Sequence, residues 1–271
     1  MKSRIIAIGA VVALLVSLSA CAPAKTGGTA SGSAQVGLSL AQVKKAGELI
    51  VGTEGTYRPF SYHADGTGAL TGYDIEVVTA VAKKLGVKAT FRETQFDGIF
   101  AGLTSKRFDV IANQVSINPT RSAKYDFSTP YTVSPGVVVV KSDNTSIHSL
   151  TDLNGKTTAQ SLTSNWYGVA EKNGANVKAV EGWAQAVELL KQGRVDATVN
   201  DKLTYLDYVK TAGAAGLKVA VTTDGPSLSA LAFVKGSTDL VAAVNLALKE
   251  LSADGTLKKI STKYFGVDVS K

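Results

Sequence analysis

The chain has one cysteine, Cys21, and two histidines, His63 and His148, among its 271 residues. A single cysteine excludes any disulfide within the chain, and two isolated histidines do not suggest a metal site. The sequence has no G-x-G-x-x-G motif and no P-loop. It also offers no arrangement from which a Ser-His-Asp triad could be argued. We therefore expect no metal, no cofactor and no catalytic residue.

Long runs of one charge are also missing. The net charge is +7, but no run of basic residues is longer than two. Such interspersed charges make nucleic acid an unexpected partner. Aromatic residues are few, at 7%, whereas the apolar fraction of 45% is enough for a globular core. A length of 271 residues fits one large domain or two lobes.

The first 21 residues indicate export. Residues 1–4 are positively charged, residues 5–18 are apolar, and the run is too short for a confident membrane-spanning helix. Residues 18–21 (LSAC) resemble a bacterial lipobox, which would make Cys21 a lipidated N-terminus on the extracytoplasmic face of the cell membrane. The alternative is a soluble secreted protein with a chance cysteine. We expect a lipoprotein signal peptide at 1–20 and a flexible Gly/Ser/Thr-rich tether at 21–38.

The remaining chain alternates strands with helices. The pattern predicts strands at 49–53, 88–93, 108–112, 137–141, 157–160, 197–199 and 231–235. It predicts helices at 74–85, 98–105 and 183–192, and two more within 239–265. Asp74 and Glu76 are expected to charge the start of the first of these helices. Alternation of this kind indicates parallel sheets with helices on both faces.

Several predicted strands end in polar or aromatic segments, at 54–60, 113–121, 161–166 and 200–201. In α/β sheets, ligands bind beyond the carboxyl ends of the strands. The segment 113–121 would bring backbone N–H groups, the Ser116 hydroxyl and the Arg121 guanidinium together. This set suits a carboxylate, which arginine binds through two parallel hydrogen bonds. The alternative is a surface loop whose arginine pairs with a neighbouring acid.

Five segments, in this order along the chain, carry a resemblance. They are 72–77 (GYDIEV), 113–116 (NQVS) with Arg121, 126–131 (DFSTPY), 192–197 (QGRVDA) and 200–201 (ND). From about Ser39 onward, the chain resembles a substrate-binding protein of a polar amino-acid ABC transporter, bacterial solute-binding protein family 3. The resemblance implies a binding protein rather than an enzyme, a monomer, an amino-acid ligand and an ABC transporter permease as partner.

The same resemblance implies the fold. It is an α/β fold of the two-lobed periplasmic-binding-protein type II, with two hinge strands and a cleft that closes over the ligand. Lobe 1 would span 39–133 plus 230–271, and lobe 2 would span 134–229.

Residue roles follow from the resemblance. Arg121 would bind the ligand's α-carboxylate, helped by Ser116 and Thr163. Asp201 would bind the α-ammonium, with the Gln114 carbonyl as a second acceptor. This agrees with physical reasoning, because a zwitterion taken out of water needs partners for both charges. For Asp201 the alternative is a helix N-cap.

Aromatic residues would flank the ligand side chain. The resemblance gives this role to Tyr57 and Phe96, for which plain packing is the alternative. Trp166 would either line the pocket or pack beneath its loop.

Within the family, the resemblance is greatest to cystine-binding members. The segments that carry it are 112–115 (ANQV), 124–128 (KYDFS), 160–166 (QSLTSNW) and 198–201 (TVND). The second head group of L-cystine would meet Asn113, Gln114, Ser164, Asn165 and Glu54. Three alternatives remain open. One is a basic amino acid with Glu54 at its far end, one is a lyase with Glu54 as general acid, and one is a sensory input domain.

Overall fold

The computed structural model describes residues 37–214 and 216–271. The expected signal peptide, Cys21 and all but the last two residues of the expected tether lie outside this part of the chain. Helix α1 (Leu40–Ala46) begins with a capping box, in which Ser39 and Gln42 each bind the other's backbone N–H. Because this arrangement satisfies donors that a helix start leaves free, regular structure begins at Leu40.

A six-stranded sheet forms the larger half of the fold. Its order is β5–β1–β6–β14–β7, with β8 also paired to β14. The strands are β1 (Glu48–Thr53), β5 (Lys88–Glu93), β6 (Val110–Ser116), β7 (Tyr125–Phe127), β8 (Thr132–Ser134) and β14 (Ser227–Val234). β1 is parallel to β5 and β6, whereas β14 is antiparallel to β6, β7 and β8.

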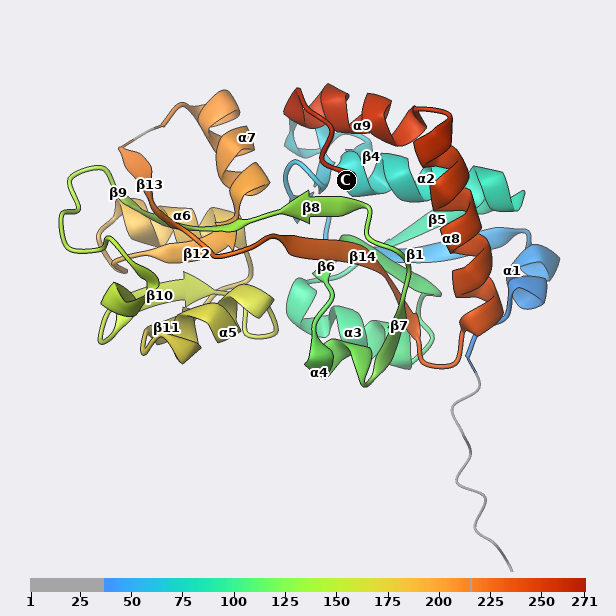
Figure 1. Cartoon of the computed structure of the whole chain (residues 1–271), viewed down its shortest axis with the longest axis horizontal. Helices are drawn as coiled ribbons and strands as arrows, with labels where there is room; N and C mark the ends of the chain where they lie inside the picture. The colour runs from blue at the N-terminus through green and yellow to red at the C-terminus, as the bar shows by residue number, and fades with distance from the viewer. Residues whose placement is uncertain (1–36, 215) are drawn as a thin grey trace, which may run out of the picture. The chain divides into compact units, whose positions relative to one another are not determined.

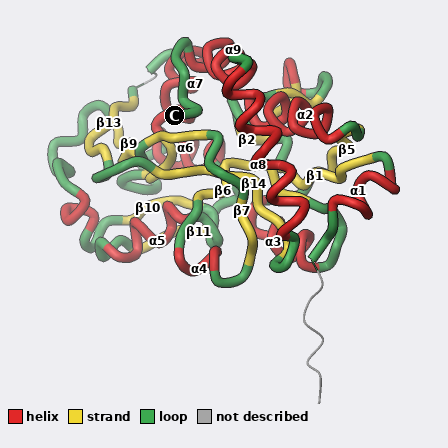
Figure 2. The backbone as a smooth tube through the Cα atoms, turned by 45° about the vertical axis from the view of Figure 1, so that its right-hand side comes forward, coloured by secondary structure: helices red, strands yellow, loops and turns green. Residues whose placement is uncertain are grey.

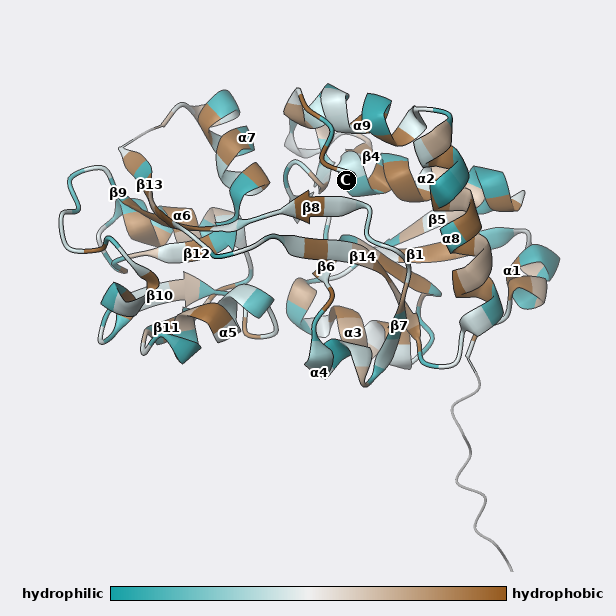
Figure 3. Ribbon diagram, viewed as in Figure 1, coloured by the Kyte–Doolittle hydropathy of each residue, from teal (hydrophilic) through white to brown (hydrophobic). Residues whose placement is uncertain are grey.

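Helices cover both faces of this sheet. One face packs on α2 (Tyr73–Leu85), α8 (Thr238–Ala253) and α9 (Thr256–Phe265). The other face packs on α3 (Phe96–Thr104). Figures 1 and 2 show α9 and α3 on opposite sides of the strands. Two apolar clusters result, and hydrophobic residues run along β14 and α2 (Figure 3).

The sequence determines where helix α2 begins and ends. Asp74 and Glu76 lie in its first turn, where the helix dipole favours negative charge. Gly86 ends it in the left-handed conformation, with φ 77°, which glycine adopts without strain. Its apolar residues recur on one face and are buried against the sheet. A small antiparallel ribbon, β2 (Thr56–Tyr57), β3 (Ser61–His63) and β4 (Leu70–Thr71), leads from β1 into α2.

A second sheet forms the other half. β9 (Gly136–Lys141) lies between β12 (Thr198–Asp201) and β13 (Leu217–Thr222), antiparallel to both. β10 (Thr157–Gln160) pairs in parallel with β11 (Asn176–Ala179), and a bridge from Thr158 to Ala197 joins this pair to the region of β12. Helix α5 (Asn165–Lys172) packs on one face, and α6 (Trp183–Lys191) and α7 (Lys202–Ala212) pack on the other.

Two strand connections join the halves, which we call lobe 1 (the six-stranded sheet and its helices) and lobe 2 (the second sheet and its helices). β8 continues through Pro135 into β9, and β13 continues through 223–226 into β14. Ser134 pairs with Ser227, so the two connections run side by side (Figure 1). No helix interrupts either connection, so the polypeptide passes directly from one sheet to the other.

The expectation of parallel sheets is therefore right for some strands and wrong for others. β1, β5 and β6 are parallel, and so are β10 and β11. β9, β12, β13 and β14 are in antiparallel pairings. The antiparallel pairings follow from the connections between the lobes. β9 and β14 each arrive directly from the other lobe, without the helical crossover that parallel neighbours need.

Candidate functional site

A cavity lies between the lobes, where β1, β6, β10 and β12 present polar residues. About 400 Å³ of space within its lining is free of protein atoms, and part of that space is open to solvent. The lining residues are Glu54, Tyr57, Phe96, Asn113 and Gln114 from lobe 1, and Ser161, Ser164, Asn165, Trp166, Gly182, Trp183 and Asn200 from lobe 2. Arg121 and Thr163 line a neighbouring groove instead.

The guanidinium of Arg121 is bound by neutral oxygens beside this cavity. Arg121 lies on the short helix α4 (Pro119–Ser122) and is 7% exposed. Its Nη1 donates to the backbone oxygen and Oγ of Ser116 at 3.0 and 2.8 Å, and Nη2 donates to the backbone oxygen of Thr163 at 2.9 Å. Phe96 lines the cavity, and its ring centroid lies 5.8 Å from Arg121 Cζ. Arg121 thus touches both lobes.

Within the described residues, no acidic side chain lies within ion-pair distance of Arg121. The alternative of a loop arginine paired with a neighbouring acid therefore finds no partner there. Burial lowers the pKa of Arg121 to about 10, so the side chain remains charged at neutral pH. A buried cation without a counter-ion is unfavourable, and a bound carboxylate would offset that cost.

Asp201 is the buried acid on the side of lobe 2. It is 4% exposed, and its Oδ1 accepts hydrogen bonds from Leu203 N at 2.8 Å and Ser134 Oγ at 2.7 Å. The first bond makes Asp201 the N-cap of α7, as the structural alternative predicted. No described residue donates to Oδ2, so capping leaves one oxygen for another partner. Burial raises the pKa of Asp201 to about 6.

Gln114 has a strained backbone that Asp74 holds. Its φ is 48°, in the left-handed region that non-glycine residues seldom adopt. Asp74, which is fully buried, accepts from the Gln114 backbone N–H at 2.8 Å and from its side-chain amide at 2.7 Å. Burial raises the pKa of Asp74 to about 7. Asp74 thus does more than charge a helix start, because it fixes the conformation of a cavity residue.

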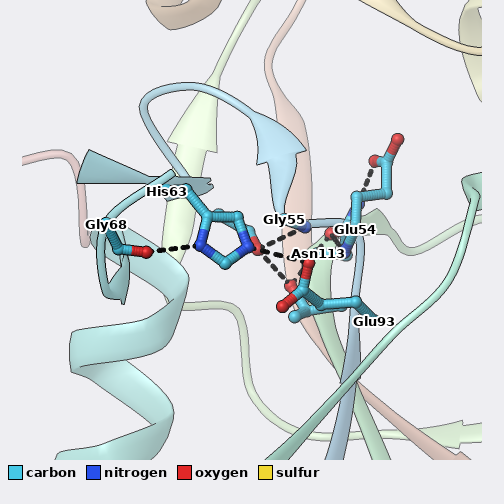
Figure 4. Close-up of polar contacts among 8 residues, drawn as sticks. Glu54, Gly55, His63, Gly68, Glu93 and Asn113 are labelled. Atoms are coloured by element: carbon cyan, nitrogen blue, oxygen red, sulfur yellow. Dashed lines mark hydrogen bonds and ion pairs between the residues drawn. The ribbon is translucent and has the colours of Figure 1, made fainter. Parts of the chain in front are cut away.

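Glu54 and Asn113 form a second polar unit. Asn113 Oδ1 accepts from the Glu54 backbone N–H at 2.8 Å, and its Nδ2 donates to Glu54 Oε2. Figure 4 shows Asn113 against Glu54, with the His63–Glu93 pair beside them. Burial raises the pKa of Glu54 to about 7, and the bond from Asn113 opposes this rise. Glu54 is therefore an acid that takes up a proton close to neutral pH.

Aromatic residues close the cavity from both lobes. Tyr57 donates from its hydroxyl to Asn200 Oδ1 at 2.8 Å and accepts from Thr204 Oγ1 at 3.1 Å, so it bridges the lobes. Trp166 and Trp183, the only tryptophans in the chain, both line the cavity. From the sequence, Trp166 was expected either to line the pocket or to pack beneath its loop, and Trp183 was not predicted as a site residue. Trp183 directly follows a glycine at a helix start.

The loop 161–164 is bound to lobe 1 through a residue that the sequence did not single out. Asp97, in the first turn of α3, accepts from Thr163 N at 2.9 Å, Thr163 Oγ1 at 3.0 Å and Leu162 N at 3.3 Å. Ser164 then caps α5 by accepting from Trp166 N. An exposed aspartate two residues into a helix carries no signal by itself, because capping and dipole effects place acids there routinely.

Two further findings bear on the class of site. Across 37–214 and 216–271, no group of three or more His, Cys, Asp or Glu side chains is placed to bind a metal ion. In the same residues, no helix combines the length and the apolar character that crossing a membrane requires.

Comparison with known proteins adds to this geometry. The family model of the bacterial extracellular solute-binding proteins, family 3, matches residues 49–267. The chain is 53% identical over 271 residues to the L-cystine-binding protein TcyA of Bacillus subtilis, and the match covers 100% of both chains.

Solved structures bear on the arrangement of the lobes. An ancestral arginine-binding protein bound to arginine is 41% identical with a TM-score of 0.76, covering 81% of this chain and 99% of its own. The L-cystine solute receptor of Neisseria gonorrhoeae, in an unliganded open conformation, is 47% identical but has a TM-score of 0.58, covering 86% and 99%. Of these two structures, the one with the higher identity has the lower TM-score, and it is the one in an open conformation.

Proposed function

The chain belongs to the bacterial extracellular solute-binding proteins of family 3, and we propose that it captures an amino acid between its lobes and delivers it to an ABC importer. The observation that carries this proposal is the buried Arg121, which is held by neutral oxygens of both lobes beside a polar cavity. An amino acid supplies the missing carboxylate. Its ammonium would bind the free Oδ2 of Asp201 and the backbone carbonyl of Gln114.

We propose L-cystine as the ligand, a role that the names of TcyA and the gonococcal receptor give to those proteins. A second cavity supports this proposal, because it shares Glu54, Tyr57, Gly182 and Trp183 with the first. Cystine has two head groups joined by a disulfide and needs such length. One head would bind Arg121 and Asp201. The other would meet polar side chains from the set Asn113, Gln114, Ser164, Asn165 and Glu54.

The middle of the ligand would lie against aromatic rings. Tyr57 and Phe96 line the first cavity from lobe 1, and Trp166 and Trp183 line it from lobe 2. Contacts between sulfur and an aromatic ring contribute on the order of 0.3–1.5 kcal/mol each. Such contacts favour a disulfide over a plain alkyl chain of the same length.

A basic amino acid is the second candidate, favoured by Glu54. Its carboxylate lies where the two cavities meet and would pair with a cationic side chain. The test is calorimetry with cystine, arginine, histidine and glutamine under non-reducing conditions. Cystine should bind, and reductant should abolish its heat because each half has only one head group. Tight binding of arginine without binding of cystine would make Glu54 the specificity residue instead.

The raised pKa of Glu54 also suits a general acid, which is the observation that favours a lyase on this fold. Among the described residues, the side chain bonded to the Glu54 carboxylate is that of Asn113, and an amide cannot serve as its acid or base partner. A binding protein remains our proposal, and incubation with candidate substrates tests the alternative. Release of product by wild-type protein, lost in Glu54→Gln, would support the lyase.

Closure of the lobes is part of the proposal. We propose that the boundary between lobe 1 (39–133 plus 230–271) and lobe 2 (134–229) falls within the hinge, so that β8 and β14 of the six-stranded sheet each contribute their hinge end to the connections with β9 and β13. Cross-lobe bonds from Arg121, Tyr57 and Asp97 support a closed state. Small-angle scattering should show a smaller radius of gyration with ligand than without it.

Anchoring rests on the sequence around Cys21. We propose that a lipid on Cys21 holds the protein, as a monomer, at the extracytoplasmic face of the cell membrane, where it meets its permease. Cys21→Ser should remove the lipid and release the protein or leave it incompletely processed. Wild-type protein found free in the medium with an unmodified Cys21 would contradict the anchor.

A further inference from the structure

We propose that Asp97 is a positioning residue that holds the cleft closed and slows ligand release without touching the ligand. This inference rests on the proposed function, because it concerns the same cleft. Asp97 belongs to lobe 1, and the three groups that donate to it, Leu162 N, Thr163 N and Thr163 Oγ1, belong to lobe 2. Asp97 does not line the cavity.

The loop that Asp97 binds is also the loop that carries ligand-facing residues. Ser161 and Ser164 line the cavity from this loop, and Asn165 and Trp166 follow at the start of α5. A carboxylate beside the N-terminal end of a helix is favoured by the helix dipole. Asp97 therefore places a wall of the cavity through contacts that exist only while the lobes are together.

Thr163 links Asp97 to Arg121. Its backbone N–H and hydroxyl donate to Asp97, while its backbone carbonyl accepts from Arg121 Nη2 at 2.9 Å. One residue of lobe 2 is thus bound on both sides by lobe 1. When Asp97 fixes the Thr163 peptide, it also fixes the acceptor that orients the guanidinium, so Asp97 acts on the ligand carboxylate through Thr163 and Arg121.

The consequence is kinetic. Ligand enters the open cleft, where Asp97 and the loop are apart, so Asp97 should not affect the association rate. Ligand leaves only after the lobes separate, which breaks the bonds to Asp97. Because Asp97 is exposed, water can replace the lost carboxylate, which keeps the net contribution of each hydrogen bond small. We therefore expect Asp97→Ala to raise the dissociation rate about tenfold, which corresponds to about 1.4 kcal/mol, with a smaller rise for Asp97→Asn.

The experiment is stopped-flow tryptophan fluorescence on purified protein with L-cystine. Both tryptophans line the cavity, so the signal reports on ligand binding and closure. Asp152→Ala is the matched control, because Asp152 also accepts two backbone N–H bonds, from His148 and Ser149, but wholly within lobe 2. It should lower the melting temperature and leave both rate constants unchanged.

Two outcomes would overturn the proposal. One is a wild-type dissociation rate in Asp97→Ala. The other is weaker binding that comes only from slower association, which would indicate damage to the open protein. Scattering adds a second test: with saturating ligand, Asp97→Ala should have a radius of gyration at least as large as wild type, whereas without ligand, when the lobes are apart, the two should agree. If wild type binds no amino acid in calorimetry, the proposed function and this inference fail together. If wild type binds and Asp97→Ala keeps the wild-type dissociation rate, only this inference fails.

Discussion

Arg121 and Asp201 are both buried, one in each lobe, but they are held in different ways. Arg121 is bound through side-chain groups to neutral oxygens of Ser116 and Thr163, and no helix depends on these bonds. Asp201 uses its Oδ1 to cap α7 and to accept from Ser134 near the hinge. In the proposed function the cation therefore serves the ligand alone, whereas the anion serves both the ligand and the fold. Substitution of Arg121 should therefore weaken ligand binding with little loss of stability, whereas substitution of Asp201 should reduce both.

The largest expected effect is at Arg121. Arg121→Ala should weaken binding by about 2–5 kcal/mol, because the ligand carboxylate would be left buried and unpaired. Arg121→Lys should also lose heavily, since an ammonium cannot form the two-bond fork. Calorimetry measures the loss, and the melting temperature without ligand should change much less. Near-wild-type binding in a folded Arg121→Ala protein would contradict the assignment.

Two substitutions at Asp201 separate its charge from its cap. Asn is a good N-cap residue, so Asp201→Asn should keep α7 intact while weakening ligand binding. Asp201→Ala should lose the same binding energy and, in addition, about 1 kcal/mol of stability from the missing cap. Thermal unfolding and calorimetry on both variants give the comparison. Equal stability of the two variants would mean that the cap contributes nothing.

The sequence predicted the regular elements well where apolar periodicity was clear. The bounds of β5 and β10 agree with the prediction, and α2 differs by one residue. β6 was predicted to end at Ala112, yet it runs to Ser116 with all seven residues buried. The error has a physical cause, because hydropathy marks Asn113, Gln114 and Ser116 as exposed. In the fold, side-chain hydrogen bonds hold Asn113, Ser116 and the Gln114 amide nitrogen, whereas Gln114 Oε1 is buried without a partner among the described residues.

The candidate site was predicted through its charges and through the family resemblance. Contacts between residues far apart in the chain were not predictable. Asp97 meets Thr163 across 66 positions, and Tyr57 meets Asn200 across 143. No local pattern encodes such a contact, because it depends on how the lobes come together. Trp183 was not predicted as a site residue, because a tryptophan at a helix start is equally suited to a hydrophobic core.

The smallest expected effect is that of pH, which should affect Asp201 but not Arg121. Burial lowers the pKa of Arg121 to about 10 and raises that of Asp201 to about 6. It also raises the pKa of Glu54 and Asp74 to about 7. Between pH 5 and 7.5 the arginine therefore keeps its charge, while the three acids change theirs.

The sign follows from proton binding. An acid whose pKa is higher in the folded state binds its proton more tightly there, so its contribution to stability is complete below its ordinary pKa. That contribution is lost as pH rises through about 6 for Asp201 and about 7 for Glu54 and Asp74. These three acids should therefore lower the melting temperature of unliganded protein as the pH rises from 5 to 7.5.

Ligand should oppose part of this fall. An ammonium beside Asp201 favours the ionised carboxylate, and each pKa unit by which it lowers the pKa of Asp201 corresponds to about 1.4 kcal/mol. The rise in melting temperature that saturating ligand produces should therefore grow from pH 5 to pH 7.5. Thermal unfolding with and without ligand across this range measures it. Asp201→Asn, which cannot ionise, should show a smaller growth with pH than wild type. An equal growth in wild type and Asp201→Asn would assign the ammonium to Glu54 or Asp74 instead.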